Sequence, residues 1–549
     1  MLGLMQEQPL LISSLLSFAA RHHGDAEIVS NTVEGPRHRY TYRDAERRAR
    51  RLARAIERLG IRRGDRVGTL AWNGYRHYEL YFAVSGMGAV IHTINPRLFD
   101  EQIAYIIDHA EDRVLFADLT FVPLLERVLG GLGRSPAVVV MMTDRQHLPE
   151  VKLPPGVVLH AYEDLLAEAD DGFVWPALDE HAAAALCYTS GTTGPPKGVL
   201  YSHRSTVLHA YAINLADVIG LRAADRALPI VAMFHVNAWG IPYAATMVGA
   251  ALVFAGARTD GASLHDLIVS ERVTYAAAVP TVWLGLLQHL RQHGGRLELL
   301  ERICVGGAAC PQLLLEALGE EYGVGVNHGW GMTEMSPVGT YNSSRRAPDG
   351  PGKSDAYARR LKQGRAFFGV DMRIVDAAGC ELPWDGATSG ELLVRGPSIC
   401  RRYFRAADDA TDADGWFRTG DIATIDADGF LQITDRSKDL IKSGGEWISS
   451  IELENIAIGH PDVAEAAVIA ARHPLWDERP LLLVVAQPGR ALDVATVLAL
   501  FEGKVARHAE PDAGLVVDEL PHTATGKLLK TALRERYGDY YLRPPSGTG

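Results

Sequence analysis

The chain has 549 residues, of which 47% are hydrophobic and 22% are charged; this is the composition of an ordinary globular protein, and the length exceeds what a single hydrophobic core organises. A net charge of −12 argues against non-specific nucleic-acid binding, which depends on basic side chains that neutralise phosphates. The five cysteines form no CxxC pair, which indicates reduced thiols in a cytoplasmic protein rather than a disulfide framework or a zinc site.

No targeting or membrane-spanning segment is expected. The first 20 residues carry no basic residue and no convincing cleavage site, so they do not resemble a signal peptide. The longest apolar stretch, residues 243–257, is interrupted by Thr246, Gly249 and Gly256 and is shorter than the ~20 residues that a membrane-spanning helix requires. These features predict a soluble cytoplasmic enzyme without an integral membrane segment.

The first 330 residues alternate between helical and strand-like patterns. Residues 43–59 carry apolar side chains at spacings of four and three and predict an amphipathic helix. Short apolar segments then recur between helical patterns, and we expect strands at 66–71, 89–93, 113–117, 137–142, 227–229, 250–255, 274–279 and 302–305. This rhythm predicts doubly wound α/β subdomains with mainly parallel sheets.

The pattern changes after residue 365. Segments 370–375, 390–394 and 429–434 are short strands separated by Gly and Asp turns, which predicts a small antiparallel β subdomain. After Gly444-Gly445 a helix is expected to begin near Ser449 or Ser450. We therefore predict a large N-terminal domain, residues 1–434, of doubly wound α/β subdomains plus a small β subdomain. A small, mobile α+β C-terminal domain, residues 435–549, would follow it.

One stretch, residues 188–199, has the composition of a phosphate-binding loop. It reads Tyr-Thr-Ser-Gly-Thr-Thr-Gly-Pro-Pro-Lys-Gly-Val and follows the apolar run 182–187. Glycines allow backbone N–H groups to converge on an anion, hydroxyls add donors and possible Mg²⁺ ligands, and Lys197 adds a positive charge. The alternative is a polar hairpin with Gly-Pro turn chemistry. It is not the GxxxxGK[ST] loop, because Gly198 follows Lys197.

The string Thr-Ser-Gly-Thr-Thr-Gly-x-Pro-Lys-Gly resembles the signature of the adenylate-forming enzymes, which include acyl-CoA synthetases, peptide-synthetase adenylation domains and luciferases. Further segments agree with this family, so the resemblance covers nearly the whole chain; they are residues 233–240, 305–309, 328–334, 415–421, 435–446 and 521–527. The resemblance implies the adenylate-forming fold, with ATP, Mg²⁺ and coenzyme A as cofactor and co-substrates.

For the nucleotide, the resemblance implies roles for Thr333 at the α-phosphate and for Asp421 at the ribose hydroxyls, with Thr189 and Glu334 as the Mg²⁺ ligands. A carboxylate facing phosphates would be repelled without a divalent cation between them. The commoner family form has Tyr where Trp330 stands. The implied nucleotide-binding set is Thr189, Ser190, Gly191, Thr192, Thr193, Gly194, Lys197, Gly307, Ala308, His328, Gly329, Trp330, Thr333, Asp421, Arg436, Lys438, Lys442 and Trp447.

For the acid, the resemblance implies that His235 borders the carboxylate pocket and that Trp239 gates the acyl tunnel, with Val236 and Gly307 beside them. The simpler alternative is that His235 and Trp239 are core residues. The implied catalytic residues are Lys527, Thr189, Glu334 and His235.

Lys527 matches the family's adenylation lysine, which would offset charge that builds between the attacking carboxylate and the α-phosphate. The alternative is an ordinary surface lysine. Asp435 is the expected hinge between the two domains.

The implied reaction forms an acyl-adenylate and then transfers the acyl group to coenzyme A. Residues 92–99, 330–332 and 443–450 most resemble medium- and long-chain fatty acyl-CoA synthetases and methylmercaptopropionate-CoA ligases. Two alternatives remain: an enzyme that hands the adenylate to an amine or a carrier protein, or uses nitrite in diazo formation, and a non-catalytic nucleotide-binding relative. The acid stays open, since one methylene is worth only ~1–3 kcal/mol in a pocket. Relatives suggest a homodimer through the N-terminal domain.

Overall fold

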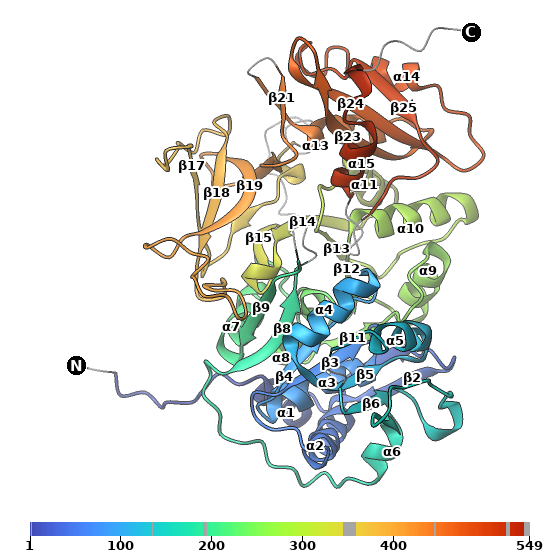
Figure 1. Ribbon diagram of the computed structural model, residues 1–549, viewed down its shortest axis with the longest axis vertical. Coiled ribbons are helices and arrows are strands. Elements are labelled where there is room, and N and C mark those ends of the chain that lie inside the picture. Colours follow the sequence, from blue (N-terminus) through green and yellow to red (C-terminus); the bar gives the residue numbers. More distant parts are fainter. Residues whose placement is uncertain are drawn as a thin grey trace.

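The computed structural model describes residues 1, 3–133, 136–189, 195–343, 358–443, 446–522 and 528–542. Two large α/β sheets form the lower part of the molecule in Figure 1, and a four-stranded sheet and the C-terminal domain lie above them. The predicted fold class, α/β layers with a small β subdomain and a small C-terminal domain, is confirmed. Within the described residues, no helix combines the length and the apolar character needed to cross a membrane.

The seven-stranded sheet carries the predicted phosphate-binding loop at one edge. Its order is β7-β6-β5-β3-β4-β8-β9, and all pairs are parallel except β8 with β9. The strands are β3 (Arg66–Leu70), β4 (Val90–Thr93), β5 (Asp112–Ala117), β6 (Val138–Met141), β7 (Val158–Ala161), β8 (Ala183–Tyr188) and β9 (Gly198–Ser202). The helices between them are α3 (Tyr75–Gly86), α4 (Asp100–Ala110), α5 (Val122–Leu129) and α6 (Tyr162–Ala167).

The nine-stranded sheet has a parallel centre and antiparallel edges, in the order β16-β15-β14-β13-β12-β10-β11-β1-β2. Its strands are β1 (Glu27–Asn31), β2 (Arg37–Thr41), β10 (Arg226–Pro229), β11 (Ala251–Phe254), β12 (Tyr275–Ala278), β13 (Arg302–Val305), β14 (Gly325–Gly331), β15 (Val338–Asn342) and β16 (Arg365–Ala366). The associated helices are α1 (Ile12–His22), α2 (Tyr42–Arg58), α7 (His203–Ile213), α8 (Ile241–Val248), α9 (Gly261–Ser270), α10 (Pro280–His293) and α11 (Gln312–Glu316).

The helix expected at 43–59 is α2. Its N-cap, Thr41, accepts a hydrogen bond from the backbone N–H of Asp44, and the Asp44 side chain accepts one from the Thr41 backbone in return. This capping box satisfies two N–H groups that would otherwise lack partners, so the helix begins where its apolar periodicity begins.

The antiparallel subdomain consists of β17 (Asp371–Val375), β18 (Gly390–Arg395), β19 (Phe417–Ile425) and β20 (Leu431–Arg436). The elements after it are β21 (Ile441–Ser443), β22 (Glu446–Ile448), α13 (Ser450–Ile458), β23 (Val463–His473), β24 (Asp477–Ala486), α14 (Val494–Leu498), β25 (Ala513–Val516) and α15 (Lys530–Tyr537). Ser449 caps α13, so the helix begins where the sequence predicts. The boundary at residue 435 stays a prediction.

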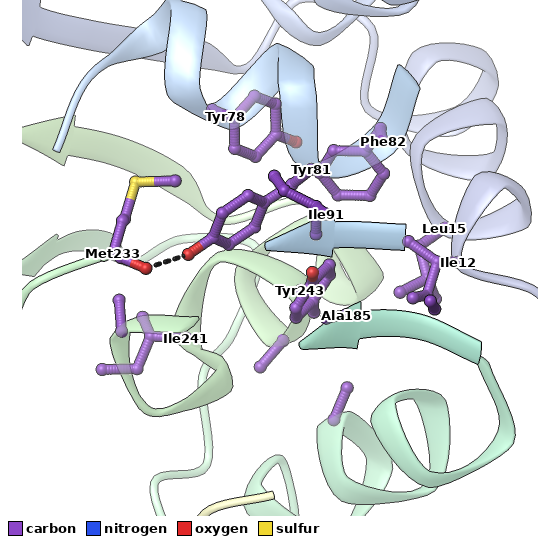
Figure 2. Packing of buried hydrophobic residues seen from close by; sticks show 14 of the residues in the cluster. Ile12, Leu15, Tyr78, Tyr81, Phe82, Ile91, Ala185, Met233, Ile241 and Tyr243 are labelled. Atoms are coloured by element: carbon purple, nitrogen blue, oxygen red, sulfur yellow. Dashed lines mark hydrogen bonds between the residues drawn. The ribbon is translucent and has the colours of Figure 1, made fainter. Parts of the chain in front are cut away.

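The packed layer between the two large sheets fixes the backbone that leads into the acid-binding motif. In Figure 2, Tyr81 of α3 lies against Tyr243 of α8, with ring centroids 5.4 Å apart. The buried Tyr81 hydroxyl donates a hydrogen bond of 2.5 Å to the carbonyl of Met233. Because these rings have almost no freedom to move, the chain two residues before His235 is held in one position.

Three fully buried histidines are held neutral. Burial lowers the pKa of His77 and His203 to about 4 and that of His209 to about 3. The His203 ring accepts a hydrogen bond from the backbone N–H of Ile12, and the His209 ring accepts one from Val338. An acceptor nitrogen would be lost if either ring took up a proton at that position.

These histidines predict acid sensitivity. The unfolded chain, with a histidine pKa near 6.5, binds more protons than the folded chain between about pH 6.5 and 4, so stability falls as the pH falls through that window. At pH 5 the loss is about 2 kcal/mol for each such histidine. His203→Asn, which retains an acceptor oxygen, should show a smaller drop in thermal unfolding midpoint between pH 7 and pH 5 than the wild type. Identical drops in both proteins would contradict the assignment.

Candidate active site

A cavity of about 810 Å³ lies between the N-terminal part of the chain and the C-terminal elements. Segments from many places in the sequence supply its walls. They include Thr189 and Lys197 and parts of residues 230–236, 306–309, 329–334, 435–439 and 528–531. Most of these segments carry the motifs that the sequence singled out, so the fold brings those motifs to one site.

The predicted phosphate-binding loop connects the antiparallel strands β8 and β9, and the flanking residues Thr189, Pro195 and Lys197 line this cavity. The Thr189 N–H donates to the Lys197 carbonyl over 2.9 Å, and the Lys197 N–H donates to the Thr189 hydroxyl oxygen over 3.2 Å. The loop is therefore closed at its base. The predicted ligands Ser190, Gly191, Thr192, Thr193 and Gly194 lie outside the described residues.

Glu334 is a buried carboxylate that lines the same cavity. A residue far away in the sequence, Tyr403, positions its side chain. The hydroxyl of Tyr403 donates to Glu334 Oε1 over 2.7 Å. The neighbouring Thr333 carbonyl accepts from the Tyr201 hydroxyl over 2.5 Å. Thr333 and Glu334 both line the cavity, as the sequence predicts for residues that meet the phosphates.

Asp421 is almost fully buried and both of its carboxylate oxygens have donors. The Trp330 indole N–H donates to Oδ2 over 2.9 Å, and Arg436 Nε pairs with Oδ1 over 2.8 Å. The commoner family form has Tyr at this position; the indole of Trp330 lacks the phenolic oxygen but supplies an N–H donor to Asp421. A ribose would compete with Arg436, whose side chain is 40% exposed, more easily than with the packed indole.

The predicted acid-binding motif, residues 233–240, ends in a left-handed turn, η3 (Val236–Gly240). Four consecutive non-glycine residues, 236–239, have positive φ angles between 42° and 57°. Each such residue costs roughly 1–2 kcal/mol, and backbone strain of this kind concentrates at functional sites. His235, Val236 and Trp239 all line the cavity.

The Trp239 indole lies against the glycine pair Gly306-Gly307. A Cβ atom at Gly306 would stand 2.9 Å from the indole, and Gly307 has a φ of +79°. Glycine at 306 permits the close approach, and glycine at 307 adopts its left-handed conformation without the steric cost of a side chain. The predicted residues Gly307, Ala308, Gly329 and Trp330 all line the cavity.

His328 differs from the other predicted nucleotide-binding residues, because it lies behind the wall. Its Nδ1 is 2.8 Å from the Leu361 carbonyl and its Nε2 is 3.4 Å from the Ala308 carbonyl. Burial lowers the pKa of this ring. In this structure His328 supports Ala308 and does not itself reach the cavity.

The predicted hinge residue Asp435 belongs to a buried charged cluster. Its carboxylate accepts from the N–H and the hydroxyl of Ser450 over 2.7 and 2.6 Å. Lys530 donates to the same hydroxyl over 2.5 Å and pairs with Glu454 over 2.7 Å. Burial raises the pKa of both carboxylates, and the ammonium of Lys530 opposes that shift.

Three predicted residues of the C-terminal part are not brought to the cavity or are not described. Lys442 and Trp447 pack on each other in the β21–β22 hairpin, with the ammonium 5.7 Å from the ring, and neither lines the cavity. Lys527 lies outside the described residues, although the flanking His522 and Leu528 pair with each other and line the cavity. Arg436 and Lys438 do line it, and burial lowers the pKa of Lys438.

Arg97, Tyr403 and Lys530 are among the cavity residues that the sequence did not predict. Arg97 places its guanidinium 6.0 Å from the Phe234 ring, and it belongs to the string 92–99 that was used only as a mark of lineage. Tyr403 and Lys530 lie in no recognised motif, and their partners are 69 and 80 residues away. No local signal could have identified these two.

Comparisons with known proteins identify relatives of this chain. The profile described as AMP-binding enzyme matches residues 16–404, and that of the AMP-binding enzyme C-terminal domain matches residues 452–527. A medium-chain-fatty-acid–CoA ligase of Ectopseudomonas oleovorans is 50% identical over 546 residues, which cover 100% of this chain and 99% of that protein. A 3-methylmercaptopropionyl-CoA ligase of Ruegeria lacuscaerulensis is 51% identical over 544 residues, 98% and 99% of the two chains. The structure of ATP-bound MatB from Rhodopseudomonas palustris matches with a TM-score of 0.79 at 25% identity, covering 96% of this chain and 99% of that one.

The chain belongs to the AMP-binding enzyme family. It is an AMP-forming acid–CoA ligase, which activates a carboxylic acid with ATP to an acyl-adenylate and then transfers the acyl group to coenzyme A. The resemblance to adenylate-forming acyl-CoA synthetases, and the use of ATP and coenzyme A that it implies, are confirmed.

The buried charged cluster of Asp435, Ser450, Glu454 and Lys530 yields a stability prediction. Lys530→Met keeps the length of the side chain but leaves the buried carboxylates of Glu454 and Asp435 without their ammonium partner. Removing one member of a buried ion pair typically costs about 3–5 kcal/mol, so the C-terminal domain should unfold at a lower urea concentration, measured by limited proteolysis. Lys504→Met, at an exposed position of the same domain, should leave the midpoint unchanged. A double variant Lys530→Met/Glu454→Gln should recover part of the loss; equal stability of wild type and Lys530→Met would refute the role.

Proposed function

We propose that this acid–CoA ligase acts on short- to medium-chain aliphatic monocarboxylic acids. The observation that carries this proposal is the apolar part of the cavity lining, formed by Ile219, Ile230, Val231, Phe234, Val279, Val282 and Leu284. Aliphatic and aromatic side chains bind a hydrocarbon or thioether chain by excluding water from it. The names of the two relatives, a medium-chain-fatty-acid–CoA ligase and a 3-methylmercaptopropionyl-CoA ligase, support the same range of acids.

The triphosphate of ATP would lie between the phosphate-binding loop and Glu334. Thr189 and Lys197 would contact the phosphates, Thr333 the α-phosphate, and Asp421 with Arg436 the ribose. Mg²⁺ prefers one or two protein oxygens plus substrate phosphates, and the Thr189 hydroxyl with the Glu334 carboxylate matches that donor set. Among the described residues no group of three His, Cys, Asp or Glu could hold a metal alone, so phosphate oxygens would have to complete the shell. When bound, the ion would neutralise phosphate charge.

Residues of the chain would then bring the acid carboxylate and the α-phosphate together, although both are negatively charged. His235, held by the strained turn, would orient the acid carboxylate toward the α-phosphate. Lys527 would approach from the C-terminal domain and offset the charge that develops as the carboxylate oxygen attacks and pyrophosphate leaves. Closure by the C-terminal domain would also exclude water from the adenylate.

Thioester formation would require a second arrangement of the C-terminal domain. The Lys442–Trp447 hairpin does not line the cavity in the present arrangement, which supports a role for it in another. Asp435 is our candidate for the pivot, with residues 1–434 and 435–549 as the two moving bodies. A cytoplasmic location and a homodimer through the N-terminal domain complete the proposal.

The proposal that the two half-reactions use different arrangements of the C-terminal domain is testable at Lys527. Lys527→Ala should lower pyrophosphate release by ~10²–10³, the usual effect of removing one transition-state stabiliser. Thioester formation from supplied acyl-adenylate and coenzyme A should persist, because that half-reaction does not use this ammonium. Lys504→Ala is the matched control and should behave as wild type in both assays. Equal loss of both half-reactions in Lys527→Ala would refute the proposal.

The acid is tested by pyrophosphate release across straight-chain acids of increasing length, 3-methylmercaptopropionate and nitrite, each with and without coenzyme A. We expect the highest kcat/KM for short- to medium-chain acids and acyl-CoA as the product. Release that is driven by nitrite, or that requires an amine or a carrier protein as acceptor, would favour the alternative reaction class. Absence of pyrophosphate release with every acid would contradict the proposed function.

A further inference from the structure

A segment outside the recognised motifs connects the strand after Lys197 with the turn that carries Glu334; both residues line the cavity. We name residues 400–404 the bridging segment. At its start, the Cys400 N–H donates to the Glu334 carbonyl over 2.7 Å; at its end, the Phe404 N–H donates to the Gly198 carbonyl over 2.8 Å. The segment is therefore tied to the strand that follows Lys197 and to the turn that carries Glu334.

Tyr403 is the residue of this segment that lines the cavity, and it interacts with two of the charged residues there, Glu334 and Lys197. Its hydroxyl donates to Glu334 Oε1 over 2.7 Å, and the Lys197 ammonium lies 5.0 Å from the centre of its ring. The first contact is a hydrogen bond to a charged acceptor, and the second is a cation–π contact.

The position of Tyr403 addresses an electrostatic difficulty. An ammonium and a carboxylate that both face one partly buried cavity attract each other strongly, because the local dielectric is lower than that of water. A direct ion pair would occupy the two groups that a magnesium-bound triphosphate needs. In the part of the chain that the structure describes, no ion pair joins Lys197 to Glu334; each contacts Tyr403 instead.

We propose that Tyr403 is a positioning residue that keeps Lys197 and Glu334 apart and correctly oriented for a magnesium-bound triphosphate. The hydroxyl fixes the carboxylate, and the ring face holds the ammonium without neutralising it. This inference rests on the proposed binding mode of ATP. It adds to that binding mode a residue, Tyr403, that lies outside the motifs recognised in the sequence. Tyr403 acts through Glu334 and Lys197 and is not itself a catalytic residue.

Two substitutions separate the functions of the hydroxyl and the ring. Tyr403→Phe removes the hydrogen bond and keeps the cation–π surface; Tyr403→Leu removes both. Tyr211→Phe, at an exposed tyrosine of α7, is the matched control and should behave as wild type. The measurements are calorimetric titrations with ATP in the presence and absence of Mg²⁺, the Mg²⁺ concentration for half-maximal pyrophosphate release, and the KM values for ATP and acid.

For Tyr403→Phe we expect about 10-fold weaker binding of ATP with Mg²⁺, an Mg²⁺ requirement raised by a similar factor, and unchanged KM for the acid. Binding of ATP without Mg²⁺ should change little in Tyr403→Phe and should weaken in Tyr403→Leu, where Lys197 is free to pair with Glu334. Restoring that binding in Tyr403→Leu by the further change Glu334→Gln would confirm the separating role.

Wild-type Mg²⁺ dependence and ATP binding in Tyr403→Phe would overturn the proposal. An equal weakening of acid binding, ATP binding and thermal stability would also overturn the proposal, since a residue with only a packing role would give that result. If the wild type binds ATP with Mg²⁺ but releases no pyrophosphate with any acid, the proposed function fails while the titrations still decide the role of Tyr403.

Discussion

Buried carboxylates in need of donors organise this active site. Four of them lie at or directly behind the cavity walls, and an uncompensated buried charge costs several kcal/mol. Each is therefore held by a donor from another part of the chain: Glu334 by Tyr403, Asp421 by Trp330 and Arg436, Asp435 by Ser450, and Glu454 by Lys530. These pairs tie the nine-stranded sheet, the antiparallel subdomain and the C-terminal helices to a single site.

The part of the cavity that is lined by His235 and Trp239 is held in place by packing rather than by charge. A left-handed turn of four non-glycine residues is unfavourable by itself, and it persists because the surrounding structure determines its position. Tyr81 holds the carbonyl of Met233 on one side, and the Trp239 indole lies on the Gly306-Gly307 backbone on the other. The aromatic core between the sheets thus has a functional consequence, because it orients His235 and Trp239 toward one cavity.

The cavity is lined from two parts of the chain. Residues near the ends of the N-terminal sheets line it together with residues of α13 and α15. The Asp435–Ser450–Lys530 contacts are among those that hold these two helices beside β20.

The sequence alone determined local features: many of the strands, the start of α2, the start of α13 near Ser449 or Ser450, and the motif segments that line the cavity. Those features depend on contiguous periodicity and on short-range hydrogen bonds, which are readable from neighbouring residues. The tertiary structure alone decided that Tyr403 meets Glu334, that Lys530 meets Glu454, and that His328 stands behind the wall. Such contacts are set by how distant strands and helices are placed against one another, and no local pattern in the chain encodes that placement.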